Sequence, residues 1–178
     1  MGKIVLDNGL RNLTRLGYRE ASLVFARRPA PLHAMITSAG YQEVRDPSYD
    51  WHGLRRGNAE FALLQYTLSG EGMLSYEGRE MRVTPGSAML LHFPHHNRYW
   101  LPRGGRWSFF YLCLNGREIL RHWRALVARV GPLVALPETS PGLRSAAAAC
   151  HAVLTQHVPS AFGASSLAYA LKIGRAHV

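Results

Sequence analysis

The chain has 178 residues, a length that fits one domain of ordinary size with a helical extension. Hydrophobic residues make up 47% of it and charged residues 18%, so it can bury a core and is not a disordered polymer. The net charge of +10 comes mostly from arginines scattered along the chain. Scattered charge of this kind indicates a solvated surface more than a direct contact with nucleic acid.

Targeting and redox features favour a cytoplasmic protein without membrane association. The sequence has no apolar run of about 18 residues or more, the length that crosses a membrane. Residues 1–16 lack the apolar segment and the small-residue cleavage site of a secretory signal. Cys113 and Cys150 lie in apolar patterns without metal or redox spacing, which predicts buried free thiols in a reducing compartment.

The first zone of the chain, residues 1–57, has a mixed pattern. Residues 22–25 and 32–37 are predicted to be short strands. Turn or arm material lies at 27–31 and 46–48, where prolines and polar residues gather. This pattern suits the first strands of a barrel and an N-terminal arm lying over it.

The second zone, residues 58–115, carries strong strand signals. Along residues 61–68, Ala62, Leu64 and Tyr66 share one face, while Gln65 and Thr67 lie on the other. Glycine- and proline-containing turns separate the strands, and Glu77-Gly78 forms a two-residue hairpin connection. Short strands at this spacing predict an antiparallel barrel or jelly roll. The predicted strands cover 61–68, 73–76, 79–83, 88–93, 96–101 and 107–114.

The third zone, residues 116–171, switches to helical periodicity. Helices are predicted over 117–130, where Gly131-Pro132 ends the pattern, over about 139–158, and near 162–171. The middle helix has a narrow stripe of small and apolar residues, which fits either a core-facing helix or a dimer seam. The residues assigned to a dimer seam are Leu143, Ala147, Cys150 and Leu154.

The last seven residues, 172–178, resemble the translation of a sequencing-adaptor read-through. They break the preceding helical pattern with a glycine and polar residues and without a cap. We therefore leave them out of the fold prediction and expect the natural protein to continue beyond Leu171.

Nine histidines raise the question of a metal site. The densest group lies at 92–96, where His92 and His96 would face the same way in a strand. A catalytic metal centre usually needs three protein ligands, and the hairpin 70–76 offers no histidine. Nucleophile elbows of the GxSxG type and glycine-rich phosphate loops are also missing. The sequence therefore predicts no metal, no cofactor and no catalytic residue.

The second zone resembles the sensor half of AraC-type (AraC/XylS) transcription regulators, over about residues 35–130. Each matching piece is short, but their order and spacing are specific, and residues 50–57 are similar to the lead-in of one subgroup. The pieces are 64–72, 76–78, 84–91, 93–99, 107–112 and 115–116.

The resemblance implies a mainly β fold, a cupin-like antiparallel barrel followed by two or three helices. Proteins of this kind bind a small effector in the barrel, dimerise through helices after it, and contact DNA through helix-turn-helix units that this sequence lacks. Aromatic walls with a few polar groups suit a small sugar or a similar polar ligand, although side chains alone can also fill a small barrel. The candidate ligand-binding residues are Arg55, Tyr66, Tyr76, His92, His95, Trp107 and Tyr111.

An enzyme is the alternative from another class. Small cupin isomerases and dioxygenases are metal-dependent and take an HxH pair with a carboxylate from one hairpin. In this sequence Glu71 and Glu77 stand alone in the corresponding region. A stoichiometric metal, lost on replacement of His92 or His96, would distinguish this alternative from a regulatory binding domain.

Overall fold

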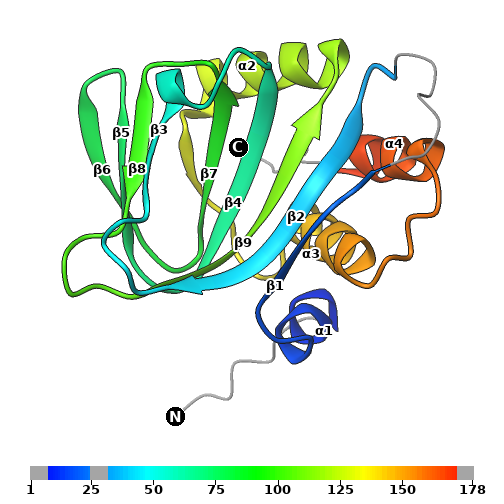
Figure 1. Cartoon of the computed structure of the whole chain (residues 1–178), viewed down its shortest axis with the longest axis horizontal. Helices are drawn as coiled ribbons and strands as arrows, with labels where there is room; N and C mark the ends of the chain where they lie inside the picture. Colours follow the sequence, from blue (N-terminus) through cyan, green and yellow to red (C-terminus); the bar gives the residue numbers. More distant parts are fainter. Residues whose placement is uncertain (1–7, 25–31, 172–178) are drawn as a thin grey trace.

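A computed structural model describes residues 8–24 and 32–171. The arm material predicted at 27–31 and the tail 172–178 lie outside the described residues. Two antiparallel sheets pack face to face, and helices cover the outer face of one of them (Figure 1). No helix within the described ranges is long and apolar enough to cross a membrane.

The larger sheet, sheet A, has six strands, and its outer face carries the helices. All of its neighbouring strands pair antiparallel, and β4 and β9 form its centre. Its order is β1 (Arg19–Ser22), β2 (Met35–Val44), β9 (Trp107–Asn115), β4 (Phe61–Gly70), β7 (Ser87–Phe93) and β10 (Leu133–Ala135).

The smaller sheet, sheet B, lies across the interior from sheet A. Its order is β3 (Asp50–His52), β8 (Asn97–Trp100), β5 (Gly72–Tyr76) and β6 (Arg79–Val83). From β2 to β9 the chain passes repeatedly from one sheet to the other, as in a jelly roll, apart from the β5–β6 hairpin within sheet B, so the predicted mainly β fold is confirmed. Glu77 and Gly78 both have positive φ, 50° and 82°, which closes the β5–β6 hairpin by a tight turn.

Strand β2 is longer than the sequence predicted and begins later. The prediction placed a strand at 32–37, whereas β2 runs from Met35 through Val44. Within this strand, Gly40 has no side chain where the Tyr111 ring on β9 lies. A Cβ at this position would be 2.3 Å from Cε1 of that ring. The glycine therefore leaves room for this ring in the middle of a strand.

The described residues form four α-helices beside the sheets: α1 (Asn8–Arg15), α2 (Arg117–Val130), α3 (Pro141–Leu154) and α4 (Ala161–Ala170). The last three correspond to the predicted helices. Helix α2 ends where expected, since Gly131 has a φ of 87° and donates its N–H to the Val127 carbonyl. Ser140 caps α3, with its hydroxyl accepting from the Leu143 N–H. Helix α1 was not predicted; it packs against α3.

Both faces of sheet A are buried. The inner face meets sheet B through side chains such as Leu63, Leu91 and Phe109. The outer face meets α2, α3 and α4 through side chains such as Leu64 and Phe110. Each central strand therefore sends alternate residues into two different cores. A side chain's position in the alternation decides whether it lies between the sheets or behind them.

Candidate functional site

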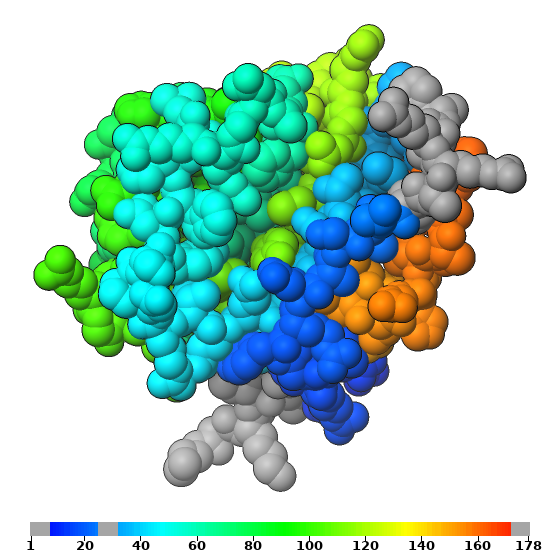
Figure 2. Space-filling view, in the orientation of Figure 1, coloured from blue at the N-terminus to red at the C-terminus, as the bar shows by residue number. Residues whose placement is uncertain are grey.

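A cavity of about 660 Å³ lies between the two sheets and opens to solvent. Figure 2 shows the opening between the N-terminal segment, in blue, and the cyan segment, with green atoms of the sheet in its floor. A volume of this size is typical of small-molecule pockets. The lining residues come from the chain around β1 and from β2, β3, β4, β8 and β9, and they include Tyr18, Glu20, Gln42, Tyr49, Trp51, Arg56, Gln65, Tyr99 and Tyr111.

A guanidinium group lies at one side of the cavity. Arg56 follows the short helix η1 (Gly53–Arg55) and is half-buried. Its guanidinium carbon lies 4.6 Å from the ring centre of Trp51, and at 5.0 and 5.1 Å from the rings of Phe93 and Phe61. One of its nitrogens donates a hydrogen bond to the Tyr99 hydroxyl. The aromatic contacts hold the cation in place beside the cavity.

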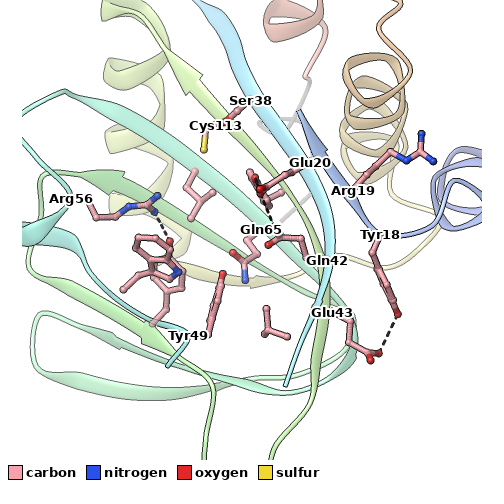
Figure 3. Close-up of a pocket in the computed structure, with 15 residues that line it drawn as sticks. Tyr18, Arg19, Glu20, Ser38, Gln42, Glu43, Tyr49, Arg56, Gln65 and Cys113 are labelled. Carbon is pink, nitrogen blue, oxygen red and sulfur yellow. Dashed lines mark hydrogen bonds between the residues drawn. The ribbon is translucent and has the colours of Figure 1, made fainter. Parts of the chain in front are cut away.

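Carboxylates lie at the opposite side, near the opening. Glu20 on β1 accepts hydrogen bonds from Gln42 Nε2 at 2.8 Å and from the Tyr111 hydroxyl at 3.2 Å. Glu43 on β2 accepts from the Tyr18 hydroxyl at 3.1 Å and pairs with Arg45. Figure 3 shows Glu20 and Gln42 directed toward each other on one side, with Arg56 on the other.

The middle of the cavity is formed by an amide and a phenol. Gln65 on β4 is 1% exposed, and its Nε2 makes no hydrogen bond of good geometry among the described residues, although the amide faces the Tyr49 phenol and lowers its pKa against the larger effect of burial. Leaving a buried donor without a good hydrogen bond costs folding free energy, so a native protein keeps such a group only for a reason such as ligand binding. Burial raises the pKa of Tyr49 well above its usual value, so this phenol remains protonated. Both groups face the same space (Figure 3).

Of the seven candidate ligand-binding residues, Tyr111 lines this cavity. Arg55 is exposed, and the arginine beside the cavity is its neighbour Arg56. Tyr66 lies in the core behind sheet A, where it packs on Phe110 and its hydroxyl donates to the Leu136 carbonyl. Trp107 is fully buried between the sheets, and its indole N–H donates to Thr67 Oγ1 at 3.0 Å.

Tyr76, His92 and His95 form a separate cluster that does not line the cavity. The His95 ring stacks on Tyr76 at 4.6 Å and lies 4.4 Å from the His92 ring. Its Nε2 is 3.2 Å from a Glu77 carboxylate oxygen. Burial, with the neighbouring His95, lowers the pKa of His92 to about 4. Within residues 8–24 and 32–171, no three His, Cys, Asp or Glu side chains gather as a metal site requires.

The residues assigned to a dimer seam lie inside the chain's own core. Leu143, Ala147, Cys150 and Leu154 on α3 are all buried in the cluster behind sheet A. The Cys150 thiol lies 3.7 Å from the Gly40 carbonyl and 3.8 Å from that of Tyr111. Their placement matches the core-facing alternative for this helix. In this position α3 lies against the backbone of β2 and β9, two strands that line the cavity.

Sequence reasoning missed Arg56, Gln65, Tyr49 and Glu20 as lining residues. Gln65 gave a usable signal, because an amide lies between the apolar residues Leu64 and Tyr66 in the first half of this strand. The other three lie in short or irregular segments whose side-chain directions no periodicity predicts. Long-range strand pairing places the segments that carry them: β1, with Glu20, pairs with β2, and β3, which lies between Tyr49 and Arg56, pairs with β8.

A jelly roll with a half-open polar cavity and helices behind one sheet defines a class of small-molecule-binding barrel domains. The chain belongs to one family of this class, the AraC-like ligand binding domain, whose family model matches residues 39–171. The match covers the cavity strands from β2 onward and continues through α4. No curated protein matches the chain.

Several solved structures resemble this chain at low sequence identity and low TM-score. YhaK from Escherichia coli shares 17% identity with a TM-score of 0.44, over 68% of this chain and 52% of YhaK, so the match spans about half of that protein. A Cupin 2 conserved barrel domain protein from Salinispora arenicola CNS-205 shares 13% identity with a TM-score of 0.39, over 70% and 90% of the two chains. The Cupin 2 domain of an XRE family transcriptional regulator from Enterobacter cloacae shares 11%, with a TM-score of 0.38, over 54% and 94%. Likeness at this level supports no argument about function.

Proposed function

We propose that this chain is the effector-sensing and dimerisation part of a cytoplasmic AraC-type transcription regulator. The effector would be a small molecule, a sugar or another polar compound, that binds in the cavity between the sheets. The observation that carries the proposal is the buried Gln65 amide, which faces a cavity of about 660 Å³ without a hydrogen bond of good geometry among the described residues. A bound ligand would satisfy it.

A route from the cavity to the helices supports a regulatory role. Strand β1 carries Glu20 at the cavity and contacts α3, while α1 also packs on α3. On the other side of sheet A, the Cys150 thiol of α3 lies against the backbone of Tyr111. A ligand that repositions Glu20 or Tyr111 would therefore bias the packing of α3. In the full regulator this would re-space two DNA-binding halves, contributed by a domain outside this sequence.

The proposed homodimer needs a surface other than the buried stripe of α3. The exposed side of α4 offers Phe162 and Tyr169, which are 66% and 56% exposed and lie two turns apart on the same face. Large exposed apolar side chains of this kind favour a protein contact. Sedimentation of the wild type and of a Phe162→Ser variant tests this surface. A wild-type monomer at micromolar concentration contradicts the dimer.

A ligand screen tests the sensing function. Thermal unfolding of the protein is followed with sugars and organic acids, and a compound at about 100 times its Kd adds about 2.7 kcal/mol of stability. For a chain of this size, each kcal/mol raises Tm by about 2–4 °C. The absence of a shift with every compound would contradict the proposal.

Two neighbouring substitutions on β4 localise the effect. Gln65→Leu removes the amide from the cavity and should reduce the ligand-induced shift. Tyr66→Phe alters the opposite face of the same strand and should leave that shift unchanged, although it removes the hydrogen bond to Leu136. Equal losses of binding in both variants would place the ligand elsewhere.

A further inference from the structure

The charges around the cavity are unequally compensated. The Glu20 carboxylate already accepts hydrogen bonds from Gln42 and Tyr111. The Glu43 carboxylate is held by Tyr18 and Arg45, with Arg106 at 3.9 Å. The Glu43 carboxylate therefore has cationic partners within the protein, whereas the Glu20 carboxylate is held by two neutral donors.

Arg56 differs from Glu43, because it has no partner of opposite charge among the described residues. None of the salt bridges formed by residues 8–24 and 32–171 includes it, although it is half-buried. Asp50 on β3 is engaged by Arg98, in a two-point contact of 2.7 and 2.9 Å. The partners of the Arg56 guanidinium are aromatic rings and one neutral phenol. A guanidinium has five N–H donors in a planar fork, and the fork matches a carboxylate.

Three neutral side chains beside Arg56, those of Gln65, Tyr49 and Tyr99, can also donate hydrogen bonds into the cavity. Gln65 has a buried NH₂ group that makes no hydrogen bond of good geometry among the described residues. The Tyr49 phenol is neutral at physiological pH, as tyrosines ordinarily are, and burial raises its pKa further. The Tyr99 phenol is neutral in the same way while it accepts from Arg56. This side of the cavity therefore offers a cation and several hydrogen-bond donors without a carboxylate, and the negative charge of a ligand would complement them.

We propose that the cavity binds a small organic carboxylate, with its carboxylate on Arg56 and its ring among the aromatic walls near Tyr49. The inference rests on the proposed function, since it names the class of effector for the same cavity. The proposed effector is thus an anion and not a neutral sugar. An aromatic acid and a sugar acid would both present the same carboxylate to Arg56. Arg56 is then the residue that determines specificity for the anion.

Matched pairs of compounds separate the carboxylate from the rest of the ligand. para-Hydroxybenzoate is compared with para-hydroxybenzamide, and galacturonate with galactose, by calorimetry and thermal shift. At least one acid should bind about tenfold or more tightly than its neutral partner, the effect of a charge-assisted contact. The two pairs also distinguish an aromatic acid from a sugar acid.

Three variants identify the residue that contacts the acid. Arg56→Gln should weaken binding of that acid about tenfold or more, and Arg56→Lys should restore part of it, since a point charge replaces a fork. Arg55→Gln removes an equal charge from the neighbouring exposed position and should leave affinity within about twofold. Arg56→Lys retains the charge beside the rings, so it keeps the test valid if Arg56→Gln does not fold.

The outcomes separate the two proposals. Binding of galactose or the benzamide as tightly as the matched acid, or equal binding by wild type and Arg56→Gln, overturns the carboxylate assignment and leaves the sensing function standing. If no compound of either class binds, both proposals fail. Acid binding that weakens equally in the Arg55 and Arg56 variants also overturns the assignment, because it indicates a general surface charge effect.

Discussion

Trp107 separates a structural role from a ligand-binding role. Its ring is fully buried at the start of β9, and its indole N–H donates to Thr67 Oγ1 at 3.0 Å. The ring also fills the space over Gly72, where a Cβ would lie 2.3 Å from it. We predict that Trp107→Phe mainly reduces stability and leaves ligand affinity nearly unchanged. Phe109 and Tyr49, whose rings lie at 5.1 and 5.9 Å, remain to hold the smaller ring.

The size of the loss follows from two contributions. Phenylalanine is smaller by about 40 Å³, and at about 24 cal/mol per Å³ the space left behind costs about 1 kcal/mol. Leaving the buried Thr67 hydroxyl without its donor costs about 1–3 kcal/mol. Together the free energy of unfolding should fall by about 2–4 kcal/mol. For a chain of this length that lowers Tm by about 5–15 °C.

Urea unfolding of the wild type, Trp107→Phe, Thr67→Val and the double variant measures the loss of unfolding free energy and the coupling energy between the two side chains. The double-mutant cycle should give a coupling of about 1–2 kcal/mol, because each single change leaves a buried partner unsatisfied. A loss below about 1 kcal/mol for Trp107→Phe, or a coupling near zero, refutes the hydrogen-bond argument. A large loss of ligand affinity at unchanged stability would instead make Trp107 a ligand-binding residue.

Two further predictions concern acid sensitivity and the α3 helix. The pKa of His92 is about 4 in the folded chain and about 6.5 in the unfolded chain, so the unfolded state binds more protons between these values. The free energy of unfolding is therefore highest above about pH 6.5 and falls toward pH 4. After allowance for partial exposure, the loss is about 2–3 kcal/mol. His92→Gln should flatten this part of the stability curve in urea titrations between about pH 7 and pH 4.5, and an unchanged slope contradicts the assignment. Leu143→Ala should lower the free energy of unfolding by about 2–5 kcal/mol at every protein concentration, because Leu143 is buried within one chain. A loss that grows on dilution would place this residue in a dimer seam.

The periodicity of the strands predicted their existence better than their orientation. On β4 the alternation was correct: Leu64 and Tyr66 share one face, and Gln65 lies on the other. Sequence reasoning assigned Tyr66 to the barrel interior, yet its face packs on the helices. Both faces of this strand are buried, so the usual difference between a polar and an apolar face is missing. Only the position of the helices behind sheet A decides which face is the interior.

The α3 stripe shows the same difficulty for helices. Its narrow line of alanines and leucines suits close packing against any flat surface. In this chain that surface is the back of sheet A, where the Cys150 thiol lies 3.7 Å from the Gly40 carbonyl. A second copy of the helix would satisfy the same pattern, and composition alone does not distinguish the two. The tertiary placement of the helix does.

The cavity exists because bulky side chains fill only one part of the space between the sheets. Trp107 and Phe109 close off the part near Gly72, where they pack with Leu74. In the remaining space, the strands instead carry a serine, an amide and a thiol, at Ser38, Gln65 and Cys113. Polar groups of this size are costly inside a barrel that merely needs filling. Their presence in the same cavity as Arg56, whose guanidinium has no anionic partner among the described residues, is therefore best explained by a polar ligand that supplies this partner.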